Sequence, residues 1–215
     1  METDRTRLAP LLVALLAVAV YAGAVRNGVV RDDYYIVAHN PLVTGERSPW
    51  LIPVSHYWAG TDGTGDLYRP LTIASYWLNA RVAGMAPWSF HLVNVLLHGL
   101  AAALVTVLAL RLTASLAAAS VAGALFATHP VLSEAVASIV GRADLLAAIF
   151  VLGAWRLRDR RGISLLLFGL GLLSKESAIV LPGFLVAEDL VRGRARARLR
   201  EYAAHAGVAA LYVAV

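Results

Sequence analysis

Long apolar segments alternate with short polar segments along most of the chain, and this pattern predicts membrane-spanning helices. An apolar run of about 20 residues is long enough to cross a hydrocarbon core about 30 Å thick. We therefore predict an all-α, polytopic transmembrane helical bundle, with spans at about 8–25, 90–112, 114–130, 139–157, 163–174 and 177–190 and the start of a seventh at 203–215. The first run also has the basic start of a signal peptide, but the recurrence of the pattern downstream favours a retained anchor.

A long polar loop, residues 26–89, separates the first two predicted spans. Its many Trp and Tyr residues argue against a disordered linker. Within it, residues 70–84 are amphipathic, with Leu71, Ala74, Leu78 and Val82 on one side. This segment predicts a helix that lies along the membrane interface and carries Trp side chains at the headgroup level.

Arginine positions predict how the chain crosses the membrane. A single helix over residues 163–190 would put the arginines of residues 192–200 on the opposite side from all other clusters, against the positive-inside rule. We therefore predict a break at Ser174–Ser177, with Lys175 and Glu176 beside a polar cavity at membrane depth. The loop 26–89 then lies outside the cytoplasm. The clusters on the cytoplasmic side contain Arg5, Arg7, Arg111, Arg156, Arg158, Arg160, Arg161, Arg192, Arg194, Arg196, Arg198 and Arg200.

Composition supports a membrane protein and narrows its partners. Hydrophobic residues make up 59% of the chain and charged residues 15%, with a mean hydropathy of +0.67, which excludes an ordinary soluble domain. The chain has no cysteine, which excludes thiolate chemistry and a cysteine-based metal site. The net charge of +5 comes from clusters between apolar segments, a topology signal, so we predict no nucleic-acid partner.

The adjacent carboxylates Asp32 and Asp33 are the first candidate for chemistry, because charge next to a membrane span needs water, a partner or a role. As a catalytic pair, one serves as a general base whose pKa its neighbour raises by like-charge repulsion. The alternative is a solvated turn or a helix cap. Paired carboxylates also bind divalent metals, and the turn Asp62–Asp66 can add ligands, so a metal stays open.

Three cations are candidate site residues, and Arg69 in particular is placed to hold a lipid-linked phosphate. Arg69 begins the predicted interfacial helix, Arg142 begins the fourth span, and Lys175 is the only lysine among the 19 basic residues. A guanidinium fits phosphate oxygens with its planar fork, whereas an ammonium is a compact charge. The alternatives are an interfacial anchor for Arg69 and a structural pair with Glu176 for Lys175.

Two further polar stripes fall on apolar segments. His91, Asn94 and His98 share one helix face, which most simply packs against another helix through hydrogen bonds. Glu134 and Ser138 have the i, i+4 spacing of a second face, which Arg142 continues. This second stripe predicts either a structural salt bridge or the lining of a cavity.

Five motifs follow one another along the chain, and they are RDDYYIVAHNPLV, YRPLTIASYWLN, FHLVNVLLH, HPVLSEAVASIVGRADLLAAIF and LLSKESAIVLP. Their order and spacing resemble the membrane half of the TMTC-type proteins, multispanning mannosyltransferases of the GT-C class whose bacterial relatives carry tetratricopeptide repeats. The resemblance covers Arg31 to about Asp189, but the repeats are missing, and we expect the sequence to be part of a longer protein.

The resemblance implies a bundle of GT-C type and a membrane glycosyltransferase that carries out O-glycosylation. Such enzymes take a sugar, here mannose, from a polyprenyl-phosphate donor and pass it to an acceptor hydroxyl, on protein or elsewhere, on the extracytoplasmic face. We expect an integral protein of a bacterial inner membrane. The family's catalytic Asp in the first outer loop corresponds to Asp32–Asp33. From topology we add Arg69, Arg142 and Lys175 as ligands of the donor phosphate. Supporting residues are His91, His129, Glu134, Asp144 and Glu176.

Two other functions compete with this interpretation. A transporter or flippase for a lipid-linked or anionic substrate also uses broken helices and buried charge. Such a protein is expected to show related halves or a chain of charges through the membrane, whereas the charges predicted outside the cytoplasm gather at one face. A scaffold without chemistry leaves the charges of Lys175 and Glu176 unexplained.

Overall fold

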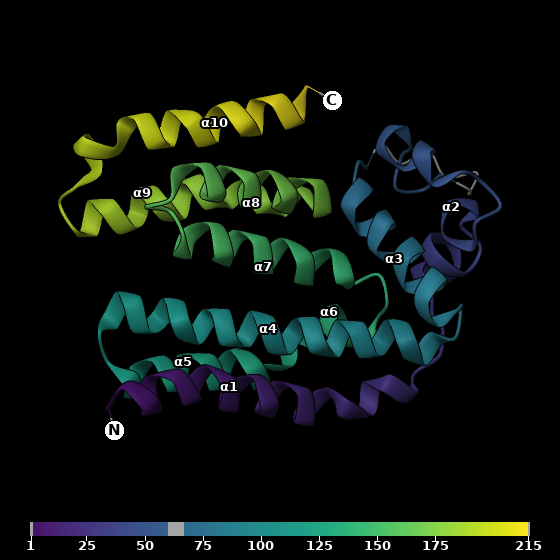
Figure 1. The fold of residues 1–215 in the computed structure, drawn as a ribbon, viewed down its shortest axis with the longest axis horizontal. Helices are drawn as coiled ribbons and strands as arrows, with labels where there is room; N and C mark the ends of the chain where they lie inside the picture. The colour runs from purple at the N-terminus through teal and green to yellow at the C-terminus, as the bar shows by residue number, and fades with distance from the viewer. Residues whose placement is uncertain (1, 60–66, 215) are drawn as a thin grey trace.

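The computed structural model describes residues 2–59 and 67–214. Every secondary-structure element in these residues is helical, which confirms the predicted all-α class. The main helices run side by side as a bundle (Figure 1). They are α1 (Glu2–Tyr21), α4 (Pro87–Thr113), α5 (Leu116–Thr128), α7 (Arg142–Arg156), α8 (Arg161–Ser174), α9 (Leu181–Val191) and α10 (Leu199–Val213).

Small residues allow the helices at the start of the chain to approach closely. Helix α1 packs against α4 and α5, and the alanines Ala17, Ala102 and Ala127 are buried where the three meet. A Cβ at Gly123 of α5 would lie 2.0 Å from Thr106 Oγ1 of α4, so only glycine fits there. In lipid, such close packing takes the place of a hydrophobic driving force between helices.

In the part of the chain that the structure describes, two helices are long and apolar enough to cross a membrane, and they lie at Thr6–Arg26 and Pro87–Thr113. The first joins α1 to η1 (Ala22–Arg26). A third candidate is the pair Leu116–Thr128 and Pro130–Ala137, bent by 47° at His129. Proline lacks the N–H that would continue the helix, which explains the bend. The other predicted spans correspond to shorter helices of 11 to 15 residues, so the six-span topology stays a prediction.

The residues between α1 and α4 fold into an outer lobe, which we define as residues 27–59 and 67–86. It contains η2 (Tyr34–Ala38), a π-helical turn, followed by α2 (Pro41–Thr44), η3 (Pro49–Val54) and α3 (Pro70–Ala83). Helix α3 buries Ile73 and Tyr76 in the core of the lobe and exposes Leu78 and Val82 on its other side. The exposed apolar side fits the predicted position along a membrane interface.

The chain breaks after α8, where the sequence predicts it. Lys175 has extended backbone angles (φ −159°, ψ 137°), and η5 (Glu176–Val180) then leads into α9. The break sends the two charged side chains to different partners: Lys175 contacts Asp144, and Glu176 contacts Arg69. The alternative interpretation, a structural pair between Lys175 and Glu176, is therefore wrong.

A second interpretation fails between α6 (Ser133–Ala137) and α7. Glu134, Ser138 and Arg142 do not share a helix face, because α6 ends at Ala137 and α7 begins only at Arg142. Residues 138–141 form a tight turn, and a Cβ at Gly141 would lie 2.2 Å from the carbonyl oxygen of Ala135. Glycine at this position thus allows the chain to fold back and start α7 beside α6.

The bundle has two distinct ends (Figure 1). The start of α1, the turn between α4 and α5 and the link from α9 to α10 lie at one end, together with the start of α8. We call it the arginine end, because it carries Arg111, Arg158, Arg161, Arg192 and Arg198. The outer lobe, α6 and the break at Lys175 lie at the opposite end, which we call the lobe end.

Candidate active site

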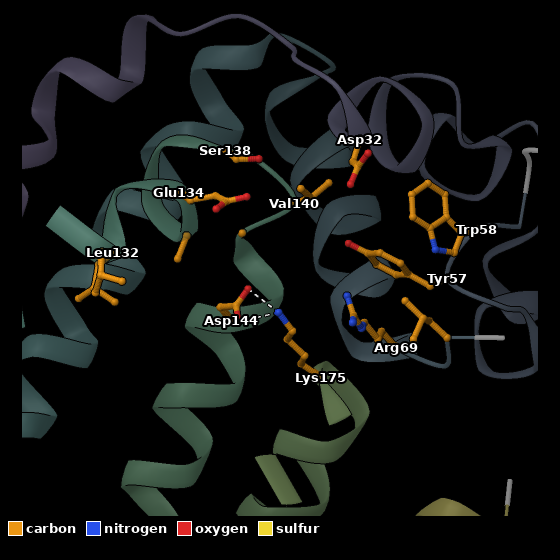
Figure 2. Close-up of a pocket in the computed structure, with 14 residues that line it drawn as sticks. Asp32, Tyr57, Trp58, Arg69, Leu132, Glu134, Ser138, Val140, Asp144 and Lys175 are labelled. Carbon is orange, nitrogen blue, oxygen red and sulfur yellow. Dashed lines mark hydrogen bonds and ion pairs between the residues drawn. The ribbon is translucent and has the colours of Figure 1, made fainter. Parts of the chain in front are cut away.

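A cavity of about 530 Å³ opens at the lobe end, between the outer lobe, α6, the start of α7 and the break after α8 (Figure 2). Residues distant in sequence line it, and many of them are charged. The structure thus brings together several predicted site residues from separate elements. The ionisable residues in the lining are Asp32, Tyr57, Arg69, Glu134, Asp144 and Lys175.

The two adjacent carboxylates have different environments. Asp33 is fully buried, and its Oδ1 accepts hydrogen bonds from the Val140 N–H (2.8 Å) and the Ser138 hydroxyl (3.1 Å). Its Oδ2 accepts one from the Val30 N–H at 3.3 Å. Asp32 is exposed and lines the cavity. Asp33 therefore ties the outer lobe to the turn before α7, and Asp32 is the carboxylate available for chemistry.

A strained residue directly precedes the two carboxylates. Arg31 has a positive φ of 46°, in the left-handed region that residues with a Cβ rarely occupy. The reversal of the chain at Arg31 comes directly before Asp32, which lines the cavity, and Asp33, which is buried. Strained backbone persists where surrounding contacts hold it, and here Asp33 supplies those contacts.

Arg69 lies at the cavity wall and is held by two groups. Its Nε and one terminal nitrogen donate to both carboxylate oxygens of Glu176, at 2.9 and 2.6 Å. Its guanidinium also lies over the ring of Tyr57, 4.9 Å from the ring centre. Burial alone would raise the pKa of Glu176, but the hydrogen bonds and charge of Arg69 lower it below the usual value of a glutamate.

Lys175 lies at the same wall and contacts Asp144. Its Nζ is 2.7 Å from each carboxylate oxygen of Asp144, which sits in the first turn of α7. The Lys175 side chain is 24% exposed and that of Asp144 is 45% exposed. The pair is thus open to the cavity, and an anion entering the cavity can reach the ammonium.

Arg142 does not line the cavity. Its side chain is buried, and it donates to the side chains of Asn94 (2.9 Å) and Asn79 (2.8 Å) and to the carbonyls of Ser75 and Phe90. With its donors used in this way, Arg142 ties α7 to α3 and α4. This placement argues against the predicted contact between Arg142 and a donor phosphate.

The predicted supporting residues divide into two groups. Glu134 is exposed and lines the cavity, as Asp144 does, and Glu176 lies behind Arg69. His91 is buried, with Nε2 3.3 Å from the Gly28 carbonyl, so it joins α4 to the outer lobe. His129 is exposed, and its Nδ1 accepts from the Val131 N–H at 3.2 Å. Neither histidine belongs to the lining of the cavity.

Metal binding gains no support from the part of the chain that the structure describes. No group of three or more His, Asp or Glu side chains there is arranged to hold an ion. The turn Asp62–Asp66, which was expected to add ligands, lies outside the described residues.

Among the ionisable residues of the lining, Tyr57 is the one that the sequence does not single out. It is only 3% exposed and stands in the outer lobe beside Trp58, which also lines the cavity. Its surroundings in the sequence, SHYW, indicate only an aromatic loop at the headgroup level. Nothing in that stretch predicts that its ring supports Arg69.

The charges in the cavity are divided between two sides. Figure 2 shows Asp32 and Glu134 on one side, with Lys175 and Arg69 on the other. Each of these two cations already has a carboxylate partner, whereas Asp32 and Glu134 form no ion pair with the described residues. The arrangement can hold an anionic group against the cations and take up a proton at Asp32.

Comparison with known proteins identifies the relatives of the chain. It is 39% identical over 203 residues to the protein O-mannosyl-transferase Tmtc2 of Drosophila melanogaster, covering 85% of this chain and 22% of that protein. It is 40% identical over 144 residues to Tmtc1 of the same organism, covering 65% and 17%. It is 38% identical over 150 residues to human TMTC2, covering 67% and 18%.

The chain therefore spans about a fifth of the length of these curated relatives. No family model matches the chain. No solved structure matches it either. The identities cover most of the chain in several independent relatives, which confirms the resemblance seen in the motifs. The chain is a homologue of the TMTC family of protein O-mannosyl-transferases.

Proposed function

We propose that the chain forms part of a membrane glycosyltransferase that moves mannose from a polyprenyl-phosphate donor to a hydroxyl of a protein acceptor. The observation that carries the proposal is the cavity in which Asp32 faces Arg69 and Lys175. Homology to protein O-mannosyl-transferases supports the same reaction class.

The reaction needs one base and a set of cations. The acceptor oxygen attacks the anomeric carbon of the sugar, and its proton passes to the carboxylate of Asp32. The bond between the anomeric carbon and the phosphate oxygen breaks, and the electron pair leaves with the phosphate. Arg69 and Lys175 stabilise the charge that develops on that leaving group. Attack from the face opposite the phosphate inverts the anomeric configuration.

An apolar groove next to Arg69 supports a lipid-linked donor. It measures about 460 Å³ and lies between η3, α3 and the end of α8. Tyr68 and Pro70, the sequence neighbours of Arg69, both line it, together with Trp50 and Trp77. A donor bound with its phosphate at Arg69 can place its isoprenoid chain in this groove, which a soluble nucleotide sugar would leave empty.

We further propose that the lobe end faces away from the cytoplasm of a bacterial inner membrane. The arginine clusters gather at the opposite end of the bundle, and such clusters stay on the cytoplasmic side. The cysteine-free sequence makes this simple to test. A cysteine replacing the exposed Ser48 should react with an impermeant thiol reagent in intact cells, and one replacing Arg196 should react only after lysis. Labelling of both from one side would exclude this orientation.

Two conservative substitutions test the proposed reaction. Asp32→Asn should reduce transfer by roughly 10²–10⁴-fold, the usual loss when a general base is removed, and leave folding intact. Asp33→Asn should lower the melting temperature, because Asn provides one acceptor oxygen where Asp33 uses two. Transfer is measured in membranes supplied with a panel of radiolabelled polyprenyl-phosphate sugars.

The outcomes separate this proposal from its alternatives. Wild-type transfer by Asp32→Asn would show that Asp32 is not the base. Movement of the lipid-linked sugar across the membrane with no transfer to any acceptor would favour a flippase.

A further inference from the structure

The hydroxyl of Tyr57 is buried and has no hydrogen bond of normal geometry among the described residues. The residue as a whole is 97% covered, and its ring lies in the lining of the cavity. Buried hydroxyls in native proteins nearly always have a partner, because an unpaired one loses its hydration without compensation. An exception next to a candidate active site indicates a partner that arrives with the substrate.

The neighbours of this hydroxyl show what kind of partner it can accept. Figure 2 shows the hydroxyl directed toward the cavity, between the carboxylate of Asp32 and the side chain of Arg69. The Tyr76 hydroxyl and the Arg69 guanidinium lie near the Tyr57 hydroxyl, but neither forms a hydrogen bond of normal geometry with it. The Tyr76 hydroxyl instead donates to the carbonyl of Ile139 at 3.1 Å. Burial raises the pKa of Tyr57 to about 12, so the hydroxyl keeps its proton at neutral pH and can act as a donor.

A donor beside a cation matches an anionic oxygen. Arg69 stands over the Tyr57 ring, so a group bound by Arg69 comes close to the Tyr57 hydroxyl. Donation to Asp32 instead would lower the basicity of the proposed catalytic base. A phosphate oxygen is therefore the better partner, since it gains a hydrogen bond to a charged acceptor without weakening Asp32.

We propose that Tyr57 is a donor-binding residue whose hydroxyl donates a hydrogen bond to an oxygen of the phosphate held by Arg69 and Lys175. The contact forms when Arg69, which covers the Tyr57 ring, turns toward the bound phosphate. This inference rests on the proposed function, because it takes the phosphate of the donor as the ligand.

The test is Tyr57→Phe, which removes one oxygen and keeps the ring under Arg69. Binding is measured on the protein purified in detergent, from its melting temperature as a function of ligand concentration. The ligands are a polyprenyl phosphate, the matching polyprenol and inorganic phosphate. Tyr57→Phe should bind the polyprenyl phosphate about 10- to 100-fold more weakly, as expected for a lost hydrogen bond to a charged group. Its melting temperature without ligand should equal or exceed that of the wild type, and polyprenol binding should be unchanged.

A matched control is available at the arginine end. The Tyr202 hydroxyl donates to Asp189 at 2.7 Å, so Tyr202→Phe should lower the melting temperature and leave the affinity for polyprenyl phosphate unchanged. In the transfer assay, Tyr57→Phe should raise the KM for the donor more than it lowers kcat.

Each other outcome overturns a definite part of the argument. If Tyr57→Phe binds polyprenyl phosphate as tightly as the wild type does, Tyr57 does not bind the donor. If Asp32→Asn has also lost sugar transfer, the proposed function stands without Tyr57. A lower melting temperature in Tyr57→Phe with unchanged affinity makes the hydroxyl structural. If the wild type binds inorganic phosphate but no polyprenyl phosphate, the proposed function fails. In that case, weaker binding of inorganic phosphate by Tyr57→Phe would still support a contact between Tyr57 and a phosphate.

Discussion

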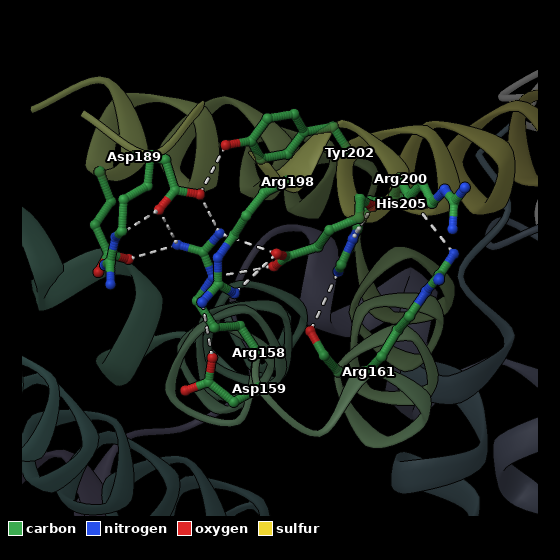
Figure 3. A network of polar contacts seen from close by, with 12 residues as sticks. Arg158, Asp159, Arg161, Asp189, Arg198, Arg200, Tyr202 and His205 are labelled. Carbon is green, nitrogen blue, oxygen red and sulfur yellow. Dashed lines mark hydrogen bonds and ion pairs between the residues drawn. The ribbon is translucent and has the colours of Figure 1, made fainter. Parts of the chain in front are cut away.

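The two ends of the bundle use the same residue types in different ways. At the arginine end, the guanidinium of Arg158 is 1% exposed and contacts the carboxylates of Glu188 (2.9 Å), Glu201 (3.0 Å) and Asp189 (Figure 3). At the lobe end, Arg69 and Lys175 each have a single carboxylate partner. Those partners, Glu176 and Asp144, are 44% and 45% exposed.

The difference separates a structural network from a binding site. Arg158 is surrounded by acceptors on α9 and α10, so it holds the link between α7 and α8 against these helices and has no donor left for a ligand. Arg69 and Lys175 face a cavity, and water already reaches the carboxylates that hold them. An anion can therefore replace those carboxylates at the lobe end but not at the arginine end.

The largest expected effect is on stability at the arginine end. Arg158→Ala leaves the buried carboxylates of Glu188, Asp189 and Glu201 without their shared cation, and breaking a buried pair in this way typically costs about 3–5 kcal/mol. We expect a large drop in the melting temperature of the protein in detergent. The matched control is Arg196→Ala. Arg196 is exposed, lies at the same end and forms no ion pair with the described residues. Equal melting temperatures for the two variants would contradict the contrast between the ends.

The next effect is on ligand binding at the lobe end. Lys175→Ala should weaken binding of polyprenyl phosphate by tenfold or more, while the free energy of unfolding changes by about 1 kcal/mol or less, as for exposed pairs. Lys175→Arg should restore binding only in part, because a planar guanidinium needs a differently shaped pocket. Both are measured by ligand-dependent melting.

The double change Lys175→Ala with Asp144→Ala shows whether this pair is structural. The second change is at Asp144, because Asp144 is the carboxylate that Lys175 contacts. Wild-type stability without recovered binding supports a ligand-binding lysine. Recovery of both stability and binding would show that Lys175 serves only to neutralise Asp144.

The sequence predicts elements whose signals are local. Apolar runs predict the helices, Pro130 predicts the bend after α5, and the arginine clusters predict the break at Lys175 that the structure contains. Asp32, Arg69, Glu134, Asp144 and Lys175 were expected near one site, and all of them line the cavity. These residues stand out in the sequence because charge is rare and unfavourable beside apolar segments.

The partners of those residues depend on tertiary structure, and the sequence does not contain a local signal for them. Arg142 and Arg69 both stand at the predicted start of a helix. In the structure, Arg142 donates to the side-chain amides of Asn79 and Asn94, whereas Arg69 faces the cavity. Asp32 and Asp33 are adjacent, and only the reversal at Arg31 and the turn at Ser138 decide which of them is buried. Tyr57 lines the cavity and lies under Arg69, but in the chain the two residues stand on either side of residues 60–66, so no local pattern joins them.

The smallest expected effect is a pH dependence of stability at the lobe end. The contact with Arg69 lowers the pKa of Glu176, so the ion pair stabilises the folded protein above the usual glutamate pKa of about 4.3. This contribution should disappear as the pH falls from about 5 through that value and then through the lower pKa of the folded state. Glu176→Gln removes the ionisable group, and all other carboxylates are common to both proteins. The difference in melting temperature between wild type and Glu176→Gln should therefore be constant above about pH 5 and shrink at lower pH.

The effect should be small because the Glu176 side chain is 44% exposed and its charge is screened by water. A difference that stays constant down to pH 3 would show that the Arg69–Glu176 contact contributes no charge-dependent stability, and the two ends of the bundle would then differ even more than the exposures indicate.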